Sequence, residues 1–261
     1  MTDKPEATGP ESEPEAEVES VELTVETVLD VLDDGEMIDT LGMLRYSSNY
    51  TFMVTMEKDG IELPAVYKPR KGERPLWDFP DGTLCNRERS AYLTSALLGW
   101  DVVPPTALRD GVHGIGSVQF YINHDPNVNY FSFDDGMAPQ LARIALFDVL
   151  INNADRKGGH LLLDEQGQVW GIDHGIAFNE DHKLRTVIWD FAGQQIPQPF
   201  MDDVEMLCGT LSDSSSEYRQ QLDGLLMPRE VDAFQQRIDR VVRTRRYPNP
   251  GPGPNYPWPA V

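Results

Sequence analysis

Cysteine is scarce in this sequence. Only Cys85 and Cys208 occur, and they form no Cys-x-x-Cys pair. Such spacing offers neither the paired ligands of a structural zinc site nor the framework of a disulfide-stabilised fold. We therefore expect both residues to be small apolar side chains or ordinary thiols.

Long apolar runs are also missing. No stretch approaches the roughly 20 apolar residues that a membrane-spanning helix requires, and the acidic N-terminus lacks the apolar segment of a secretory signal. The sequence therefore predicts a soluble, cytoplasmic protein without membrane insertion.

Basic residues are the third deficiency. The 22 Lys and Arg face 43 Asp and Glu, which gives a formal net charge of −21. Nucleic acids are bound through concentrated positive charge, so this balance argues against a nucleic-acid partner. It also disfavours anionic membranes unless basic groups gather locally. Part of the acid lies in residues 1–20, which have almost no large apolar side chains and are expected to form a disordered tail.

The rest of the chain has the pattern of an α+β protein. Stretches rich in β-branched and aromatic residues predict strands at residues 37–46, 50–57, 62–68 and 116–122, with an edge strand that begins within 102–106. Apolar periodicity predicts helices at residues 21–33, 84–99, 139–152, 201–211, 215–226 and 228–245. We expect a mainly β N-lobe (21–122), a linker or insertion (123–136), a C-lobe (137–246) and a Pro-rich tail (247–261).

A lysine stands at the end of the third predicted strand. Lys68 is either an ordinary surface lysine or an ammonium group that a rigid strand holds toward a phosphate. The turn Ser47-Ser48-Asn49 would cover the same cleft, and its small residues leave backbone N–H groups free for phosphate oxygens. Glu88 on the predicted helix 84–99 could pair with Lys68, although Arg87 and Arg89 beside it are equally typical of a solvated surface.

Two aspartates flank a predicted β-hairpin. The apolar runs at 161–163 and 169–172 are separated by a polar turn that contains Gly, which is typical of two short antiparallel strands. This hairpin would bring Asp155 and Asp173 together with a histidine nearby. Converging carboxylates can hold a divalent metal or divide the roles of base and metal ligand. The alternative is that both are ordinary turn aspartates.

Four motifs in one order make the sequence resemble a known family. Tyr67-Lys68-Pro69, the run Arg87-Glu88-Arg89-Ser90-Ala91-Tyr92, Asn153-Ala154-Asp155-Arg156, and Ile172-Asp173-His174-Gly175-Ile176-Ala177-Phe178 are similar to motifs of the phosphatidylinositol 3/4-kinase-like proteins. The similarity is greatest to type II phosphatidylinositol 4-kinases and to a group of actinobacterial kinase-like proteins, and it covers roughly residues 38–226. It implies a two-lobed protein-kinase-like fold that binds ATP with Mg²⁺ or Mn²⁺.

The resemblance also implies a role for each matching residue. Lys68, steadied by Glu88, would contact the α- and β-phosphates, and Ser47, Ser48 and Asn49 would cover them. Asp155 would orient or deprotonate the acceptor, and Asp173 would bind the metal. Arg156 and Lys157 could bind the acceptor or a phosphate. The adenine would lie near Gln119, Phe120, Tyr121 and Ile122.

One residue departs from the family pattern. The family usually has Asn five residues after the loop aspartate, as a second metal ligand, and here that position is His160. An imidazole suits Mn²⁺ or Zn²⁺ better than Mg²⁺. The first hypothesis is therefore an ATP-dependent phosphotransferase with an unknown hydroxyl acceptor. The second is a pseudokinase that binds nucleotide without transfer, for which a protein partner is possible, and a third option is adenylyl transfer.

Overall fold

The computed structural model describes residues 23–43 and 50–261. Its strands are β1 (Glu36–Met43), β2 (Phe52–Lys58), β3 (Ile61–Pro69), β4 (Thr106–Gly111), β5 (Gly114–Phe120), β6 (Leu161–Leu163) and β7 (Val169–Gly171). Its α-helices are α1 (Val25–Asp34), α2 (Leu84–Leu98), α3 (Ala138–Ile151), α4 (Gln198–Ser212), α5 (Glu217–Leu225) and α6 (Pro228–Thr244). Short 3-10 turns are η1 (Arg70–Gly72), η2 (Tyr130–Ser132), η3 (Asp135–Met137) and η4 (Gly158–His160).

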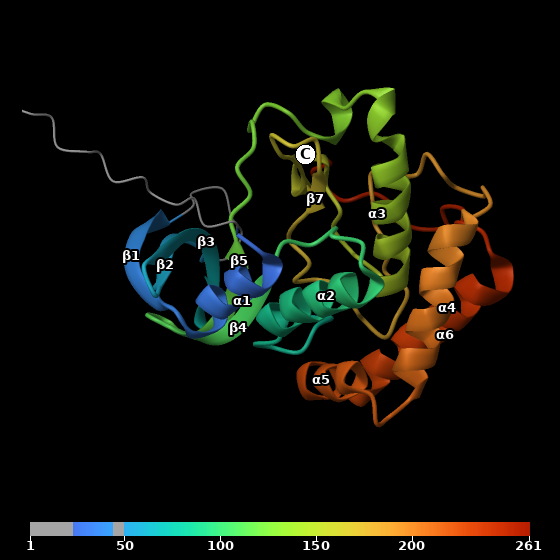
Figure 1. Cartoon of the computed structure of the whole chain (residues 1–261). Coiled ribbons are helices and arrows are strands. Elements are labelled where there is room, and N and C mark those ends of the chain that lie inside the picture. Colours follow the sequence, from blue (N-terminus) through green and yellow to red (C-terminus); the bar gives the residue numbers. More distant parts are fainter. Residues whose placement is uncertain (1–22, 44–49) are drawn as a thin grey trace, which may run out of the picture.

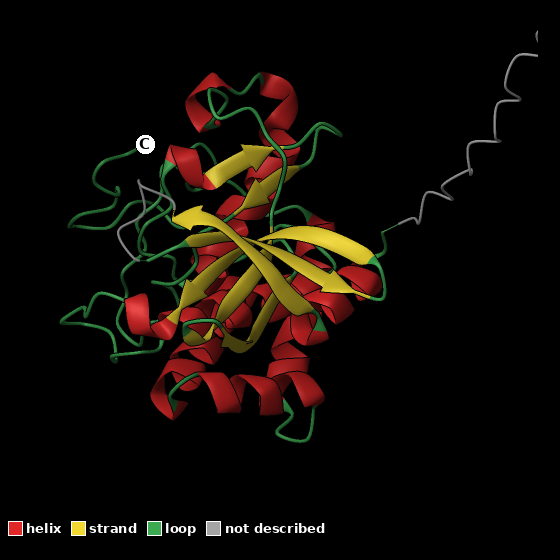
Figure 2. Cartoon of the chain, turned by 90° about the vertical axis from the view of Figure 1, so that its left-hand side faces the viewer, coloured by secondary structure: helices red, strands yellow, loops and turns green. Residues whose placement is uncertain are grey.

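A five-stranded antiparallel sheet forms the N-terminal part. Its strand order is β1-β2-β3-β5-β4, so the chain passes from β3 through α2 to the edge strand β4 before β5 pairs with β3. The strands twist across one another when the sheet is seen from its open side (Figure 2). On β2 and β3 alternate residues are buried, as period-two patterning requires, and Val54, Met56 and Leu63 pack beneath α1. The sheet therefore has its own apolar core.

A second, larger apolar core lies among the helices. Helix α3 is buried on most of its surface, and α4, α5 and α6 pack around it and around α2. Figure 1 shows α2 between the sheet and these helices. Its position explains why α2 buries charged residues as well as apolar ones: both of its long faces meet protein. The molecule thus has a β part and a helical part, each with a core, joined through α2.

The α+β, two-lobed fold expected from the sequence is present, with shifted boundaries. Helix α2 ends at Gly99 in the left-handed conformation (φ 62°), as its predicted C-cap requires. β4 is an edge strand but begins only at Thr106, after the two prolines, which cannot donate to a sheet. The turn Ser47-Ser48-Asn49 lies outside the described residues. No helix in the described ranges 23–43 and 50–261 is both long and apolar enough to cross a membrane.

Candidate functional site

The end of β3 places Lys68 on the face of the sheet opposite the core beneath α1. Leu63, Ala65 and Tyr67 alternate into the core, so the side chain of Lys68 points the other way. β3 is held on both sides by β2 and β5, with Lys68 opposite Ser117, so the backbone that carries the ammonium group is rigid. Strand alternation and central sheet position together determine where this cation lies.

The ammonium group of Lys68 lies between two carboxylates. Its Nζ is 2.6 Å from Oε1 of Glu88 and 3.1 Å from Oδ1 of Asp173. Glu88 comes from α2 and is buried, and its second oxygen accepts a hydrogen bond of 2.9 Å from the backbone N–H of His174. Three segments far apart in the sequence therefore meet at one cation, and Glu88 holds both the lysine and the Asp173 loop.

This arrangement keeps Lys68 and Asp173 ionised. Burial works to lower the pKa of Lys68, but the carboxylates of Asp173 and Glu88 outweigh it and raise that pKa above its usual value. The Lys68 ammonium in turn holds the pKa of Asp173 well below its usual range, against the opposing effect of burial. Asp173 is thus a carboxylate throughout the physiological pH range, half-exposed and able to accept a further cation.

Asp155 lies on the loop that follows α3. Asn152 ends that helix in the left-handed conformation, and the side chain of Asn153 accepts a hydrogen bond of 3.0 Å from the N–H of Asp155. The Asp155 carboxylate is 2.9 Å from Nζ of Lys157. Burial raises the pKa of Asp155, and the nearby charge of Asp173 adds to this, while Lys157 opposes both. A carboxylate with a raised pKa is a better proton acceptor than an exposed one.

His160 stands beside Asp173. Its Nε2 is 3.3 Å from Oδ2 of Asp173. Burial lowers the pKa of His160 to about 4, with the positive charges of Arg156, Lys157 and Lys68 acting in the same direction and Asp173 against them. The imidazole is therefore neutral, which is the form that ligates metals. Its Nδ1 is buried without a hydrogen-bond partner in the described part of the chain.

A neutral imidazole and an ionised carboxylate side by side suit a divalent cation. Within residues 23–43 and 50–261 no group of three His, Cys, Asp or Glu side chains converges, so these residues do not form a closed protein cage. Such an open pair fits Mg²⁺ or Mn²⁺ as they occur with nucleotides, where phosphate oxygens and water complete the coordination. The donor set, one oxygen and one nitrogen, favours Mn²⁺ over Mg²⁺.

Arg156 does not lie where an acceptor contact requires. Its side chain is fully buried, and its guanidinium bonds both carboxylate oxygens of Asp148 on α3, at 3.0–3.2 Å from Nε. Further bonds reach the carbonyls of His160 and Ile172 and the ring of His174. The expected contact of Arg156 with an acceptor or phosphate is therefore wrong: the arginine fastens the Asp155 loop to the Asp173 loop from inside the protein.

The segment expected beside the adenine leaves the sheet at the end of β5. Gln119 and Ile122 are buried, and Phe120 and Tyr121 are half-buried. The backbone N–H groups of Phe120 and Tyr121 donate to the carbonyls of Pro105 and Pro64, at 2.8 and 3.0 Å. The amide side chain of Gln119 bonds the hydroxyl of Thr106 on β4 at 2.9 Å, so it is turned toward the edge strand.

Comparison with known proteins identifies the family of this arrangement. The family model described as phosphatidylinositol 3- and 4-kinase matches residues 109–226. Protein Rv2133c of Mycobacterium tuberculosis (strain ATCC 25618 / H37Rv) is 39% identical over 265 residues, which cover 88% of this chain and 94% of that protein. This chain belongs to the phosphatidylinositol 3/4-kinase-like family.

More distant similarities agree with this assignment. Phosphatidylinositol 4-kinase gamma 4 of Oryza sativa subsp. japonica is 27% identical over 123 residues, or 43% of this chain and 22% of that protein. The crystal structure of the Helicobacter pylori proinflammatory kinase CtkA superimposes with a TM-score of 0.50 and 11% identity, covering 84% of this chain and 94% of that one. The superposition on CtkA shows the fold, which is kinase-like in both lobes.

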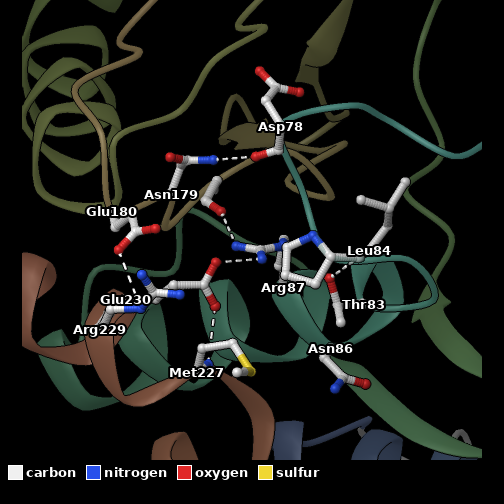
Figure 3. Close-up of polar contacts among 12 residues, drawn as sticks. Asp78, Thr83, Leu84, Asn86, Arg87, Asn179, Glu180, Met227, Arg229 and Glu230 are labelled. Atoms are coloured by element: carbon white, nitrogen blue, oxygen red, sulfur yellow. Dashed lines mark hydrogen bonds and ion pairs between the residues drawn. The ribbon is translucent and has the colours of Figure 1, made fainter.

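A buried cation next to Glu88 was not expected from the family motifs. Arg87, one residue before Glu88, was given no role from the sequence beyond flanking that residue, and its side chain is fully buried. Its Nη1 donates to the carbonyl of Ala177 at 2.6 Å, and its Nη2 lies 2.5 Å from Oε1 of Glu230 on α6. Figure 3 shows the guanidinium of Arg87 directed at Glu230, which also accepts a hydrogen bond from the N–H of Met227. Arg87 thereby fixes the helix that carries Glu88.

Asp148 is the second residue that the motifs did not indicate. It is the single acidic residue of α3, and it is fully buried against Arg156, as Glu230 is buried against Arg87. The available signal was its position: a single carboxylate within the apolar pattern of residues 141–151, eight residues before an arginine in the Asp155 loop. A charge in such a place requires a partner.

Proposed function

We propose that this protein is an ATP-dependent phosphotransferase that transfers the γ-phosphate of ATP to a hydroxyl group of an acceptor. The observation that carries the proposal is the position of Lys68, whose ammonium group lies between Glu88 and Asp173. Phosphoryl transfer needs little covalent help from a protein, and most of the rate comes from positioning and from neutralising charge. An ammonium group held rigidly beside an ionised carboxylate supplies both.

Each residue of the site has a role in this reaction. Lys68 binds the oxygens of the α- and β-phosphates, and Glu88 holds it in place. The acceptor oxygen forms a bond to the γ-phosphorus while the bond from that phosphorus to the β,γ-bridging oxygen breaks, which leaves ADP. Asp155 lies within the same loop system and receives the proton of the acceptor hydroxyl, helped by its raised pKa. Lys157 beside it limits that rise and attracts an anionic substrate.

The residues that would hold the metal are Asp173 and His160. Mg²⁺ or Mn²⁺, when bound, supplies positive charge between the phosphate groups. We further propose that residues 21–122 and 137–246 act as the two lobes around the nucleotide, with residues 119–122 beside the adenine and residues 123–136 as their linker. The buried contacts of Arg87 and Arg156 support this, because Arg87 fastens the segment after Asp173 to α2 and Arg156 fastens the Asp155 loop to the Asp173 loop.

A pseudokinase is the second candidate, and one observation favours it. His160 stands where related kinases usually have Asn, and its low pKa does not remove the difference between an imidazole nitrogen and an amide oxygen as ligands. In this alternative the chain binds nucleotide but does not transfer phosphate, and a protein partner responds to the bound state.

One experiment separates these functions. The thermal shift with ATP is measured in Mg²⁺ and in Mn²⁺ for the wild type, for Asp173→Ala, and for Asp110→Ala as a control at an exposed position on β4. Chromatography of the nucleotide follows in the same samples, with candidate acceptors present. The kinase predicts a metal-dependent shift that Asp173→Ala loses and Asp110→Ala keeps, with ADP formed.

Other outcomes lead elsewhere. A shift with unchanged ATP favours the pseudokinase, and AMP or pyrophosphate indicates adenylyl transfer. If ATP binds with the same affinity to Asp173→Ala as to the wild type in both metals, the metal assignment is wrong. Absence of any shift in the wild type contradicts nucleotide binding altogether.

A further inference from the structure

A cavity of about 320 Å³ lies in the helical part, and none of its lining residues belongs to the site described above. Its walls come from the C-terminal half of α6, from the segment that follows that helix, and from loops on either side of residue 184. The wall after α6 is fixed by backbone hydrogen bonds of Tyr247 with Gln194 (3.0 Å) and Gly193 (3.1 Å). The cavity is thus built by paired backbone rather than by a loose surface loop.

Positive charge gathers in this cavity. Arg237, Arg240, Arg246 and His182 line it, and the lining that the structure describes contains no Asp or Glu. The chain as a whole has about two acidic residues for each basic one, with a net charge of −21. The charge of this concave surface is therefore opposite to that of the chain as a whole. Its positive electrostatic potential attracts small anions.

Arg237 is incompletely paired inside the protein. Its Nε donates to the carbonyl of Leu150 at 3.0 Å, and its Nη1 donates to the carbonyl of Asn179 at 3.1 Å. Its Nη2 is buried and has no hydrogen-bond partner in the described residues. Burial lowers the pKa of Arg237 to about 9, and Glu230 opposes that only through space. A buried guanidinium without a bonded counter-ion is costly, which makes the position favourable for an anion.

The other cations face the same space. The pKa of His182 is lowered, first by burial and then by the positive charges of Arg240 and Arg237, so these three side chains lie near one another. Arg240 forms no ion pair with any residue that the structure describes, and it is exposed, so its guanidinium is available to a ligand. Asn249, also in the lining, adds a neutral donor.

We propose that this cavity is a second ligand site, which binds a small phosphate-bearing anion. Guanidinium groups present a planar fork of donors that matches the oxygens of a phosphate. The volume is at the lower end of the range for small-molecule sites, so the occupant is a compact phosphorylated molecule rather than a polymer. Arg237 bonds the carbonyl of Leu150 before the Asp155 loop and the carbonyl of Asn179 after the Asp173 loop. An anion bound to Arg237 would therefore contact the side chain that holds the ends of both loops.

The test uses inorganic pyrophosphate and inorganic phosphate as probes, without ATP. Titration calorimetry is carried out on the full chain with Lys68→Met, so that the proposed nucleotide cleft cannot account for binding. In that background the double change Arg240→Gln/Arg246→Gln is compared with Arg243→Gln, which is exposed on α6 like Arg240 but does not line the cavity. We expect the double variant to bind about tenfold or more weakly, because charge-assisted hydrogen bonds are lost, and Arg243→Gln to bind as before.

A second measurement does not depend on these variants. Phenylglyoxal modifies accessible arginines, and mass spectrometry locates the modified sites. Pyrophosphate is expected to protect Arg240 and Arg246 but not Arg243. The proposal is overturned if the Lys68→Met protein binds neither probe, if all variants bind equally, or if Arg243 is protected as strongly as Arg240. None of these results depends on whether the protein transfers phosphate.

Discussion

Arg87 on α2 and Glu230 on α6 form a buried ion pair, with 2.5 Å between Nη2 and Oε1. Burial lowers the pKa of Arg87, and the Glu230 carboxylate counteracts this. The pair joins the helix that carries Glu88 to the helix that forms one wall of the basic cavity. The orientation of Glu88, and with it the position of Lys68, thus depends on a contact that does not involve the candidate site itself.

Breaking this pair on one side should strongly destabilise the protein. Arg87→Met leaves the Glu230 carboxylate buried and unpaired, and Glu230→Gln leaves the Arg87 guanidinium buried without a counter-ion. Each single variant should lower the free energy of unfolding by about 3–5 kcal/mol. The double variant should cost less than the sum of the two single variants, since no lone charge remains. Equilibrium urea denaturation measures all three.

The control for this prediction is Arg219→Gln. It breaks the half-exposed pair of Arg219 with Asp223 on α5, which should contribute less than about 1 kcal/mol. Single variants of Arg87 and Glu230 that are no less stable than Arg219→Gln would show that the buried pair does not hold α2.

Glu88→Gln should impair ATP use rather than folding. The change keeps the shape of the side chain but weakens its bonds to Nζ of Lys68 (2.6 Å) and to the N–H of His174 (2.9 Å). Loss of a charge-assisted hydrogen bond is worth about 1.5–3 kcal/mol, so kcat/KM for ATP should fall by about 10- to 100-fold. Steady-state ADP release measures this, with Glu62→Gln at an exposed position on β3 as the matched control. Equal losses in both variants would argue against the role of Glu88.

His160→Asn should shift the metal preference from Mn²⁺ toward Mg²⁺. It replaces a neutral imidazole nitrogen beside Asp173 by an amide oxygen, which Mg²⁺ prefers. The ratio of ATP affinities in Mg²⁺ and Mn²⁺, from thermal shifts across a metal titration, measures the change. His113→Asn, exposed in the turn between β4 and β5, should leave this ratio as it is. An unaltered ratio in His160→Asn would remove His160 from the metal site.

Buried tyrosines should make stability fall at alkaline pH. Burial raises the pKa of Tyr218 and of Tyr247 above the usual value of about 10. Each phenol therefore stays neutral in the folded state at a pH where it ionises in the unfolded state. Its contribution to the free energy of unfolding is complete below about pH 10 and is lost as pH rises further. Tyr218→Phe, which removes the bond of 2.9 Å to Thr94, should flatten this pH dependence. Tyr256→Phe, at an exposed position, should not.

Local patterning was sufficient for much of the fold. The alternation on β2 and β3 and the Gly99 cap of α2 are determined by residues close in sequence, and the structure has these elements where they were expected. The pairing of Lys68 with Glu88, which the sequence left open against a solvated glutamate, is present. Here the family motifs decided between two interpretations that local pattern alone could not separate.

The arginines next to the motif acids were the failures. Arg87 and Arg156 each stand beside a residue of the site, and from the sequence Arg87 was assigned no partner and Arg156 a contact with the acceptor or a phosphate. Their partners, Glu230 and Asp148, are 143 and eight residues away. An arginine is buried only where such a partner meets it, and tertiary packing rather than local pattern decides that. The sequence therefore indicated the residues of the site but not the buried charges that hold their loops and helix in place.

The C-terminal segment provides the last prediction, because it is bonded to the Asp155 loop and to the segment around Thr186, which pairs with Arg156 of that loop. The carbonyl of Ala260 accepts from the N–H of Gly158 at 2.8 Å, and that of Asn255 accepts from the N–H of Thr186 at 3.1 Å. Gly158 begins the short turn that ends at His160. Removal of residues 254–261 should therefore loosen the backbone next to the proposed metal ligand.

Hydrogen exchange monitored by mass spectrometry or NMR checks this loosening. A net backbone hydrogen bond is worth about 0.5–1.5 kcal/mol, so amide exchange at Gly158 and Thr186 should be about 2- to 10-fold faster in the shortened chain. The amide of Gly171, which donates to the carbonyl of Val102 at 2.7 Å, should exchange as in the full chain. If Gly158 and Thr186 keep their protection, the segment lies on the loops without supporting them. If protection falls at Gly171 as well, the segment stabilises the whole helical part rather than the site.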